Sequence, residues 1–422
     1  MQISMGLLGQ RRFLPLFATQ FLGAFNDNLF KNAMVLFAVY SVYDDPRQET
    51  WFSGLATGLF ILPFFLLSAT SGQLADATDK ARIIRLVKLA EVLIMLVGAA
   101  GLLLPSIPLM LAALLAMGVH STFFGPIKYA ILPQHLARDE VLAGTGLVEA
   151  GTYIAILAGT ILAGIVAVEI AAALVIAVAL IGYATGRQVP PAPPTGELIQ
   201  VDHNPFTASF RLVSATMHIR RLFLAIVSIS FFWTIGAVLF IQFPPLVKNV
   251  LTADKAVASL FLAIFSVGVA IGSVLINRWL KGDVSARHSP PAVIVMGGFV
   301  LGFFFVARSW QPAPGDGFYD VMEFLAHPQA LPLLGTLLGV AIAGGVFVVP
   351  LYAFLTTTVS QGETARTVAA NNIVNAGAMV IGSVLALGLS AIGVSAVDQL
   401  LMTASMCIVS AWLAYKLHLA CD

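Results

Sequence analysis

Long apolar stretches alternate with short polar segments along the whole chain. Twelve of these stretches hold the roughly 20 mostly apolar residues that a membrane-spanning helix needs. Lipid offers no hydrogen bonds to the backbone, so such stretches cross a membrane as helices. They lie at 13–41, 51–75, 83–104, 107–132, 142–168, 170–186, 221–247, 256–280, 291–307, 331–355, 367–392 and 396–418. The pattern predicts an all-α membrane protein with twelve transmembrane helices.

The longest internal polar stretch divides this pattern into two. It runs over residues 187–220, begins near the Pro-rich VPPAPPTG, and has too few apolar residues to cross lipid. We therefore expect a six-helix half at 1–186, a cytoplasmic linker at 187–220 and a second six-helix half at 221–422.

Short matches in the same order indicate that the halves are pseudo-symmetric. GLFILPFF followed by Gly72 matches SLFLAIFS followed by Gly272, and GPIKYAIL matches VPLYAFL. GLVEAG matches NIVNAG, which places Glu149 opposite Asn375. Transporters built from two parallel repeats bind their substrate between the repeats near the membrane midplane. Glu149 and Asn375 are therefore expected to face one site that straddles the halves.

Composition supports a membrane protein without catalytic chemistry. The chain is 59% hydrophobic and 10% charged, whereas a soluble domain has about 25% charged residues. Its two cysteines, Cys407 and Cys421, provide neither a disulfide framework nor a metal-ligand spacing. The phosphate-binding GxxxxGK[ST], the zinc-binding HExxH and the GxSxG nucleophile elbow are absent. We expect no enzyme activity, no cofactor and no ATP-driven transport.

The basic residues predict the orientation. Most Lys and Arg residues lie in the segments that share a side with the N-terminus, and only four, Arg47, Lys248, Lys255 and Arg308, lie opposite. By the positive-inside rule both termini are cytoplasmic. Arg11 and Arg12 precede a first stretch that is too long and too polar for a signal peptide, so this helix is expected to be retained.

The first apolar stretch contains an unusual polar segment, FLGAFNDNLFKN at 21–32. A charged side chain at the bilayer centre costs about 2.5–3.5 kcal/mol on insertion scales, so such residues usually face a bundle interior or a watery cavity. Asp27 and Lys31 lie four apart and can pair on one helix face, with Asn28 and Asn32 beside them. We interpret the four as cavity-lining and substrate-binding residues. The alternative is an ion pair that only stabilises the helix.

A second set of candidate substrate-binding residues consists of Glu149, Asn371, Asn372 and Asn375. Their alternative role is interhelical hydrogen bonding, worth on average about 0.6 kcal/mol per bond. Lys128, at the cytoplasmic end of the fourth stretch, can bind a phosphate or extend to the membrane interface.

Two other polar positions receive a structural interpretation. His120 is alone in the fourth stretch and is interpreted as a packed helix contact rather than a proton relay. Glu91 follows Lys88 by three residues, a spacing that predicts a local pair.

The loop after the second stretch reads GQLADATDKAR and is a candidate cytoplasmic gate formed by Gly72, Asp76, Lys80 and Arg82. Gly72 is expected to allow close helix approach, and Asp76 to interact with a helix N-terminus or with Arg82. The second half carries Ile276 at the position of Asp76, so we expect an asymmetric gate. The alternative is an ordinary charged turn.

Four segments carry a family resemblance: FLGAFNDNLFKN, GQLADATDKAR, FFGPIKYAILPQHL and GLVEAGTYIAILAGTILAG. Together they resemble the lysophospholipid transporter family of the major facilitator superfamily, more closely in the first half than in the second. They are also similar to the transporter module that some bacterial proteins fuse to an acyltransferase and an acyl-carrier-protein ligase. The segment LAGTILAG lacks the Gly-Pro pair that drug antiporters of the superfamily usually carry there.

The resemblance implies that lysophosphatidylethanolamine or lysophosphatidylglycerol is flipped from the outer to the inner leaflet of a bacterial inner membrane, for reacylation by a separate acyltransferase or acyl-ACP synthetase. Lys31 or Lys128 would attract the phosphate, Asp27 or Glu149 the ammonium group, and the asparagines the glycerol. Two other classes stay open. A proton-coupled exporter of amphipathic drugs would titrate Asp27 or Glu149, and a membrane scaffold would tolerate their neutralisation.

Overall fold

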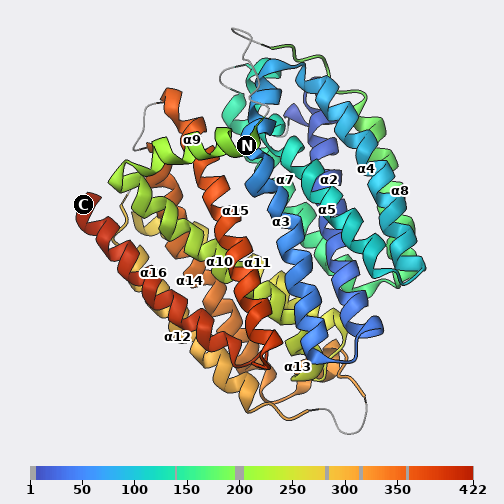
Figure 1. Cartoon of the computed structure of the whole chain (residues 1–422), viewed down its shortest axis with the longest axis vertical. Helices are drawn as coiled ribbons and strands as arrows, with labels where there is room; N and C mark the ends of the chain where they lie inside the picture. Colours follow the sequence, from blue (N-terminus) through green and yellow to red (C-terminus); the bar gives the residue numbers. More distant parts are fainter. Residues whose placement is uncertain are drawn as a thin grey trace. The chain divides into compact units, whose positions relative to one another are not determined.

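The computed structural model describes residues 6–137, 140–194, 204–280, 285–312, 317–357 and 361–421. These residues form a helical protein (Figure 1). The one departure from helices and loops among them is an isolated β-bridge between Ala253 and Tyr319. The prediction of an all-α protein is confirmed.

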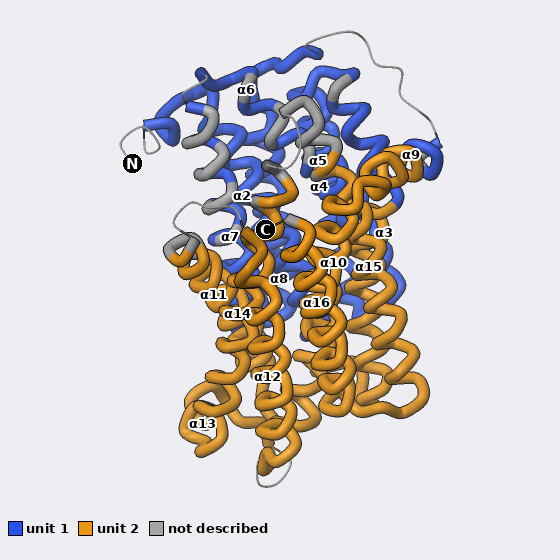
Figure 2. The backbone as a smooth tube through the Cα atoms, turned by 90° about the vertical axis from the view of Figure 1, so that its left-hand side faces the viewer, with its two compact units in different colours: residues 1–37, 66–208 blue, residues 38–65, 209–422 orange. Residues whose placement is uncertain are grey.

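Packing divides the chain into two compact units, coloured separately in Figure 2. Unit 1 contains residues 1–37 and 66–208, and unit 2 contains residues 38–65 and 209–422. The chain passes between the units three times: between residues 37 and 38, inside α3 (Pro46–Ala77) and inside α9 (Pro205–Met217).

Unit 1 is built around α2, which packs against α7 and α8, while α4 packs against α5 and α8. Its helices are α2 (Leu14–Phe37), α4 (Lys80–Leu103), α5 (Ile107–Ala130), α6 (Leu132–His135), α7 (Val141–Ile165) and α8 (Val168–Gly186). The side chain of Asp79 begins α4 by accepting a hydrogen bond from the Ala81 N–H, an N-cap that satisfies one of the free donors of the first turn.

Unit 2 repeats this arrangement, because α10 packs against α15 and α16, and α12 against α14 and α16. Its elements are the π-helix η1 (Ala38–Val42), α10 (Arg220–Asn249), α11 (Lys255–Leu280), α12 (Ser289–Arg308), α13 (Val321–Ala326), α14 (Ala330–Thr357), α15 (Gln361–Ala391) and α16 (Gln399–Cys421). The order of helices and the partners within each unit agree, as expected for two copies of one packing scheme.

Ten helices are long and apolar enough to cross a membrane, counted over the described residues. They correspond to ten of the twelve predicted stretches. The other two stretches coincide with α2 and α7. The centre of α2 carries the polar residues of 26–32, and only Ile154–Ile165 of α7 counts as a shorter apolar helix. The chain is therefore a multi-pass membrane protein.

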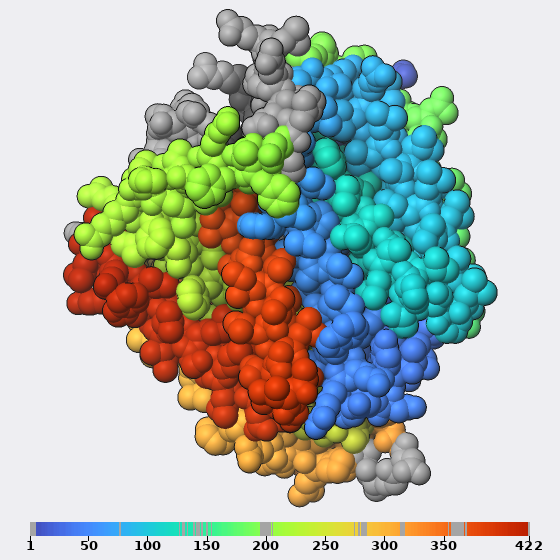
Figure 3. Space-filling model, in the orientation of Figure 1, coloured from blue at the N-terminus to red at the C-terminus, as the bar shows by residue number. Residues whose placement is uncertain are grey.

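The linker stretch contains the amphipathic helix α9, which Figure 3 shows at the surface, across the ends of the unit 2 helices. Phe206 and Phe210 lie four residues apart and are 66% and 74% exposed. Two exposed aromatic rings on one face suit an interfacial helix rather than a membrane span.

Candidate functional site

The most buried charges of unit 1 meet between α2, α4 and α5. Glu91 and Lys88 on α4 form an ion pair, and both side chains are about fully buried. The Asn26 amide donates to Glu91 Oε1 at 3.0 Å and to the Val175 carbonyl of α8 at 3.1 Å. His120 Nε2 of α5 lies 3.2 Å from Glu91 Oε2. The predicted local pair is present and is extended into a network over four helices.

Glycines make room for the buried lysine. A Cβ atom on Gly182 of α8 would lie 2.9 Å from Lys88 Nζ, and one on Gly23 of α2 would lie 3.3 Å from it. Gly186, one turn further along α8, would place its Cβ 3.2 Å from Lys88 Cγ. The lysine can therefore run between α2 and α8 to reach Glu91.

Asp27 lies beside this network and is half-buried, as is Lys31 one turn along α2. The Ser121 hydroxyl donates to Asp27 Oδ2 at 2.5 Å. Asp27 Oδ1 has no hydrogen-bond partner among the described residues. Sequence reasoning found Asp27 but missed Ser121, because the two belong to different helices and no periodicity connects them.

The Asn28 amide bonds within α2, and the Asn32 amide also joins α2 to α7. Each amide donates to the carbonyl four residues earlier, and the Asn32 amide also donates to Thr160 Oγ1 of α7 at 3.0 Å. At this level α7 presses on α2, since a Cβ on Gly159 would lie 2.5 Å from the Phe25 carbonyl oxygen. Both asparagines are half-buried, so the packing role of Asn32 does not exclude the predicted cavity-lining role, which stays a prediction for both.

A second polar cluster lies in unit 2 and is centred on Tyr352 of α14. Its hydroxyl accepts from Trp233 Nε1 at 2.7 Å and from the Asn375 amide at 3.4 Å. Ser230 of α10 donates to Asn375 Oδ1 at 2.7 Å. Asn371, also buried, has an Oδ1 atom without a partner among the described residues. Tyr352 stands in the repeat segment VPLYAFL, so the sequence carried a signal for it.

The remaining predicted residues divide between exposed, half-buried and undescribed positions. Asn372 is exposed and lies 3.5 Å from the Asn371 amide. Lys128 is half-buried in the last turn of α5. The side chains of Glu149 and Asp76 lie outside the described residues.

The candidate gate stays a prediction, and the structure describes only part of its surroundings. A Cβ on Gly72 would meet no atom of the described residues within 4 Å, so the expected close approach is not found there. It is found at Gly272 of α11, whose Cβ would collide with the Ile342 carbonyl of α14. Lys80 is buried and Arg82 is exposed. The helix N-terminus is capped by Asp79, which also accepts from the Ala192 N–H at 3.0 Å.

Sequence reasoning missed an ion pair between Glu49 and Lys248, which lies near the C-terminal end of α10. Lys248 Nζ donates to Glu49 Oε1 at 2.6 Å, to the Val39 carbonyl at 2.6 Å and to the Tyr43 carbonyl at 2.8 Å. The Asn249 amide donates to the other oxygen of Glu49. This group, here called the clasp, fixes segment 38–65 to the end of α10.

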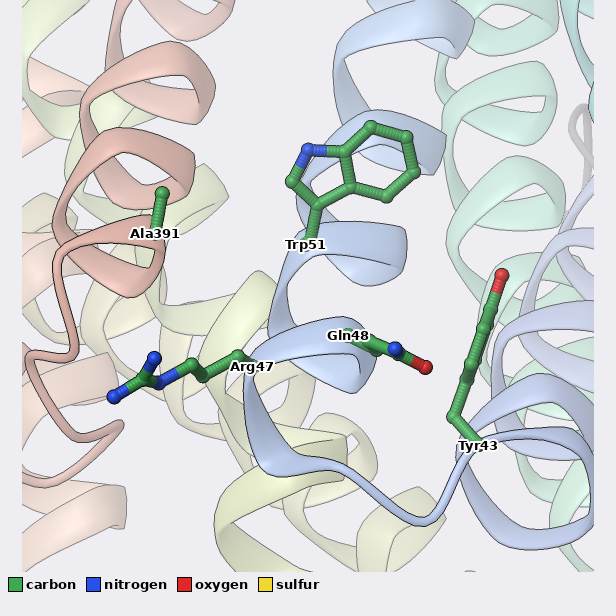
Figure 4. Close-up of a pocket in the computed structure, with 5 residues that line it drawn as sticks. All are labelled: Tyr43, Arg47, Gln48, Trp51 and Ala391. Atoms are coloured by element: carbon green, nitrogen blue, oxygen red, sulfur yellow. The ribbon is translucent and has the colours of Figure 1, made fainter.

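A pocket of about 390 Å³ opens next to the clasp, lined by Tyr43, Arg47, Gln48, Trp51 and Ala391. Figure 4 shows Arg47 extended toward the helix that carries Ala391, with Gln48 and Tyr43 on the other side. All five residues belong to unit 2. In the described part of the chain, no three His, Cys, Asp or Glu residues gather closely enough to hold a metal ion.

Comparison with known proteins places the chain in a family. The family profile described as Major Facilitator Superfamily matches residues 16–383. The chain is 26% identical over 360 residues to the Lysophospholipid transporter LplT of Serratia proteamaculans, covering 82% of this chain and 80% of that protein. It is 27% identical over 378 residues to the Lysophospholipid transporter LplT of Cronobacter sakazakii, covering 87% and 85%.

Solved structures agree on the fold. A bacterial homolog of the human lysosomal transporter Spinster superposes with a TM-score of 0.68 at 14% identity, covering 97% of both chains. The nucleoside transporter NupG superposes with a TM-score of 0.70 at 12% identity, covering 97% of this chain and 100% of that one. With the family profile covering most of its length, the chain belongs to the major facilitator superfamily.

Proposed function

We propose that this protein moves lysophospholipids such as lysophosphatidylethanolamine and lysophosphatidylglycerol from the outer to the inner leaflet of the bacterial inner membrane by alternating access. The observation that carries the proposal is the similarity to proteins named Lysophospholipid transporter LplT over 82–87% of the chain. The chain then has twelve spans in two six-helix halves, with both termini in the cytoplasm. A separate acyltransferase or acyl-ACP synthetase reacylates the lipid.

The chemistry of the substrate matches the polar clusters. A lysophospholipid carries an anionic phosphate, a glycerol hydroxyl and, in the ethanolamine form, an ammonium group. We assign the phosphate to Lys31 with Lys128, and the ammonium to Asp27 with Glu149. Asp27 and Lys31 are half-buried at the centre of α2, where a charge without a function would only be costly. The glycerol is assigned to the asparagines Asn28, Asn32, Asn371, Asn372 and Asn375.

Uptake of labelled lysophospholipid by proteoliposomes tests the proposal, with rates normalised to folded protein. Asp27→Asn and Lys31→Ala are each expected to reduce uptake at least about tenfold, since a hydrogen bond to a charged group contributes about 1.5–3 kcal/mol. Asp44→Asn and Lys416→Ala are matched controls, because both side chains are exposed and distant in sequence from the clusters. Wild-type uptake by both α2 variants would leave only a structural ion pair.

The substrate assignment in the repeat can fail separately. Glu149→Gln and Asn375→Ala are each expected to slow uptake of lysophosphatidylethanolamine. Normal uptake by both would remove them from the site while the transport activity stands. Efflux of amphipathic drugs in place of lysophospholipid uptake would support the exporter alternative instead.

A further inference from the structure

A line of close polar contacts connects the buried network of unit 1 to Asp27. It begins at Glu91 Oε2, which lies 3.2 Å from His120 Nε2. The other ring nitrogen, Nδ1, lies 3.4 Å from the Ser121 hydroxyl oxygen. Ser121 in turn donates to Asp27 Oδ2 at 2.5 Å. The line therefore runs from a fully buried carboxylate to a half-buried one.

The line needs one more proton than a neutral His120 and an ionised Asp27 supply. Glu91 can only accept, and it already receives the Lys88 ammonium and the Asn26 amide. Ser121 has a single proton, which it gives to Asp27. Both nitrogens of His120 thus face acceptors, whereas a neutral imidazole has only one N–H. When His120 is an imidazolium and Asp27 a carboxylate, Nδ1 has a proton for Ser121, and Nε2 meets Glu91 as an ion pair rather than in hydrogen-bond geometry.

The same proton satisfies the line in a second arrangement. A neutral His120 keeps its proton on Nε2, which faces Glu91, and accepts at Nδ1 from the Ser121 hydroxyl, which then accepts from a protonated Asp27. We propose that His120, Ser121 and Asp27 form a proton-binding site that holds one exchangeable proton and connects it to transport. The transfer is balanced: the Nδ1 proton passes to Ser121 Oγ as the Ser121 proton passes to Asp27 Oδ2.

The surrounding charges allow this proton to move. On α4, Lys88 and Glu91 neutralise each other, and α2 contributes Lys31 beside Asp27. The contact from α8 is the Val175 carbonyl, which is uncharged. Asp27 Oδ1 is buried and has no hydrogen-bond partner among the described residues, so this second acceptor of the carboxylate is not used by the line. An ammonium headgroup at Asp27 would require the carboxylate, and its positive charge would favour release of the shared proton from His120.

Infrared difference titration of the protein in lipid vesicles without substrate tests the site. The carboxylic-acid C=O band of Asp27, assigned with Asp27→Asn, and the imidazole bands of His120, assigned with His120→Gln, are expected to change in one shared pH step, as in coupled titrations. Ser121→Ala should separate them into two steps. Imidazole bands that stay constant between about pH 5 and 9, or two independent steps with Ser121 intact, would overturn the proposal.

A transport experiment gives the second readout and rests on the proposed function. The KM for lysophosphatidylethanolamine should rise by up to about tenfold per pH unit as the pH falls, because protons compete with the ammonium group at Asp27. Lysophosphatidylglycerol, which has no ammonium, should show less dependence. His218→Gln, at an exposed histidine on the linker, is the matched control for His120→Gln. A pH-independent KM for both lipids would refute the coupling. Absence of any uptake would refute the transport function, while the infrared titration still decides the proton site.

Discussion

Removing the negative charge of Glu49 is expected to loosen segment 38–65 from α10. The Glu49 side chain is fully buried and that of Lys248 is only 11% exposed. Breaking a buried ion pair by removing one partner costs about 3–5 kcal/mol, because the other charge is left buried. Lys248 keeps the Val39 and Tyr43 carbonyls, which places the expected loss for Glu49→Gln near the lower end of that range, at about 3 kcal/mol.

Hydrogen exchange measured by mass spectrometry can read this loss directly. Amides of the segment exchange when it opens locally, so a loss of about 3 kcal/mol should speed their exchange about 150-fold. Peptides covering 38–52 report on the opening, with the protein held in lipid nanodiscs. Arg308→Gln is the control, since Arg308 pairs with Asp398 at the surface with side chains 65% and 47% exposed. Exposed pairs contribute about 0–1 kcal/mol. Amide exchange in the Arg308→Gln variant should therefore change about fivefold at most.

A double variant separates the ion pair from simple loss of packing. Combining Glu49→Gln with Lys248→Met removes both charges at similar volume and should recover much of the lost protection. Exchange in Glu49→Gln within about threefold of wild type would refute the buried-charge argument. The argument would also be refuted if the double variant lost as much protection from exchange as the two single variants lose together.

Three further predictions concern unit 1. Gly159→Ala should destabilise the packing of α7 on α2 by about 1–3 kcal/mol, because its Cβ meets backbone rather than a movable side chain, and a lower thermal midpoint would show it. Asp76→Asn should shift the balance between inward-open and outward-open states more than substrate affinity; unchanged cysteine labelling on both faces together with unchanged turnover would reject the gate. The Ala137 N–H, helped by the Arg12 guanidinium, holds the pKa of Glu140 below its usual range. The stability contributed by this contact is present above about pH 4.3 and is lost as the pH falls through the lowered pKa, so Glu140→Gln should remove the acid dependence of proteolysis near the N-terminus.

The spans could be predicted because length and apolar content alone determine what can cross a membrane. Ten described helices that are long and apolar enough to cross a membrane fall on ten of the twelve predicted stretches, and α2 is not among them because its centre is polar. The site could be predicted only where polar residues cluster along one helix. Asp27 and Lys31 were visible in this way. Ser121 and Tyr352 gained their partners through packing of helices far apart in sequence.

The position of His120 shows what sequence periodicity leaves out. A single histidine in an apolar helix carries no information about which group it will meet, so a packed contact was the reasonable interpretation. In the folded unit its two nitrogens face Glu91 on α4 and Ser121 beside Asp27. Glu91 can only accept and the Ser121 proton goes to Asp27, and these contacts are the basis for proposing a proton shared by His120 and Asp27. The candidate chemistry of this unit therefore depends on how α2, α4 and α5 pack against one another. The sequence of each helix alone does not show which groups this packing brings together.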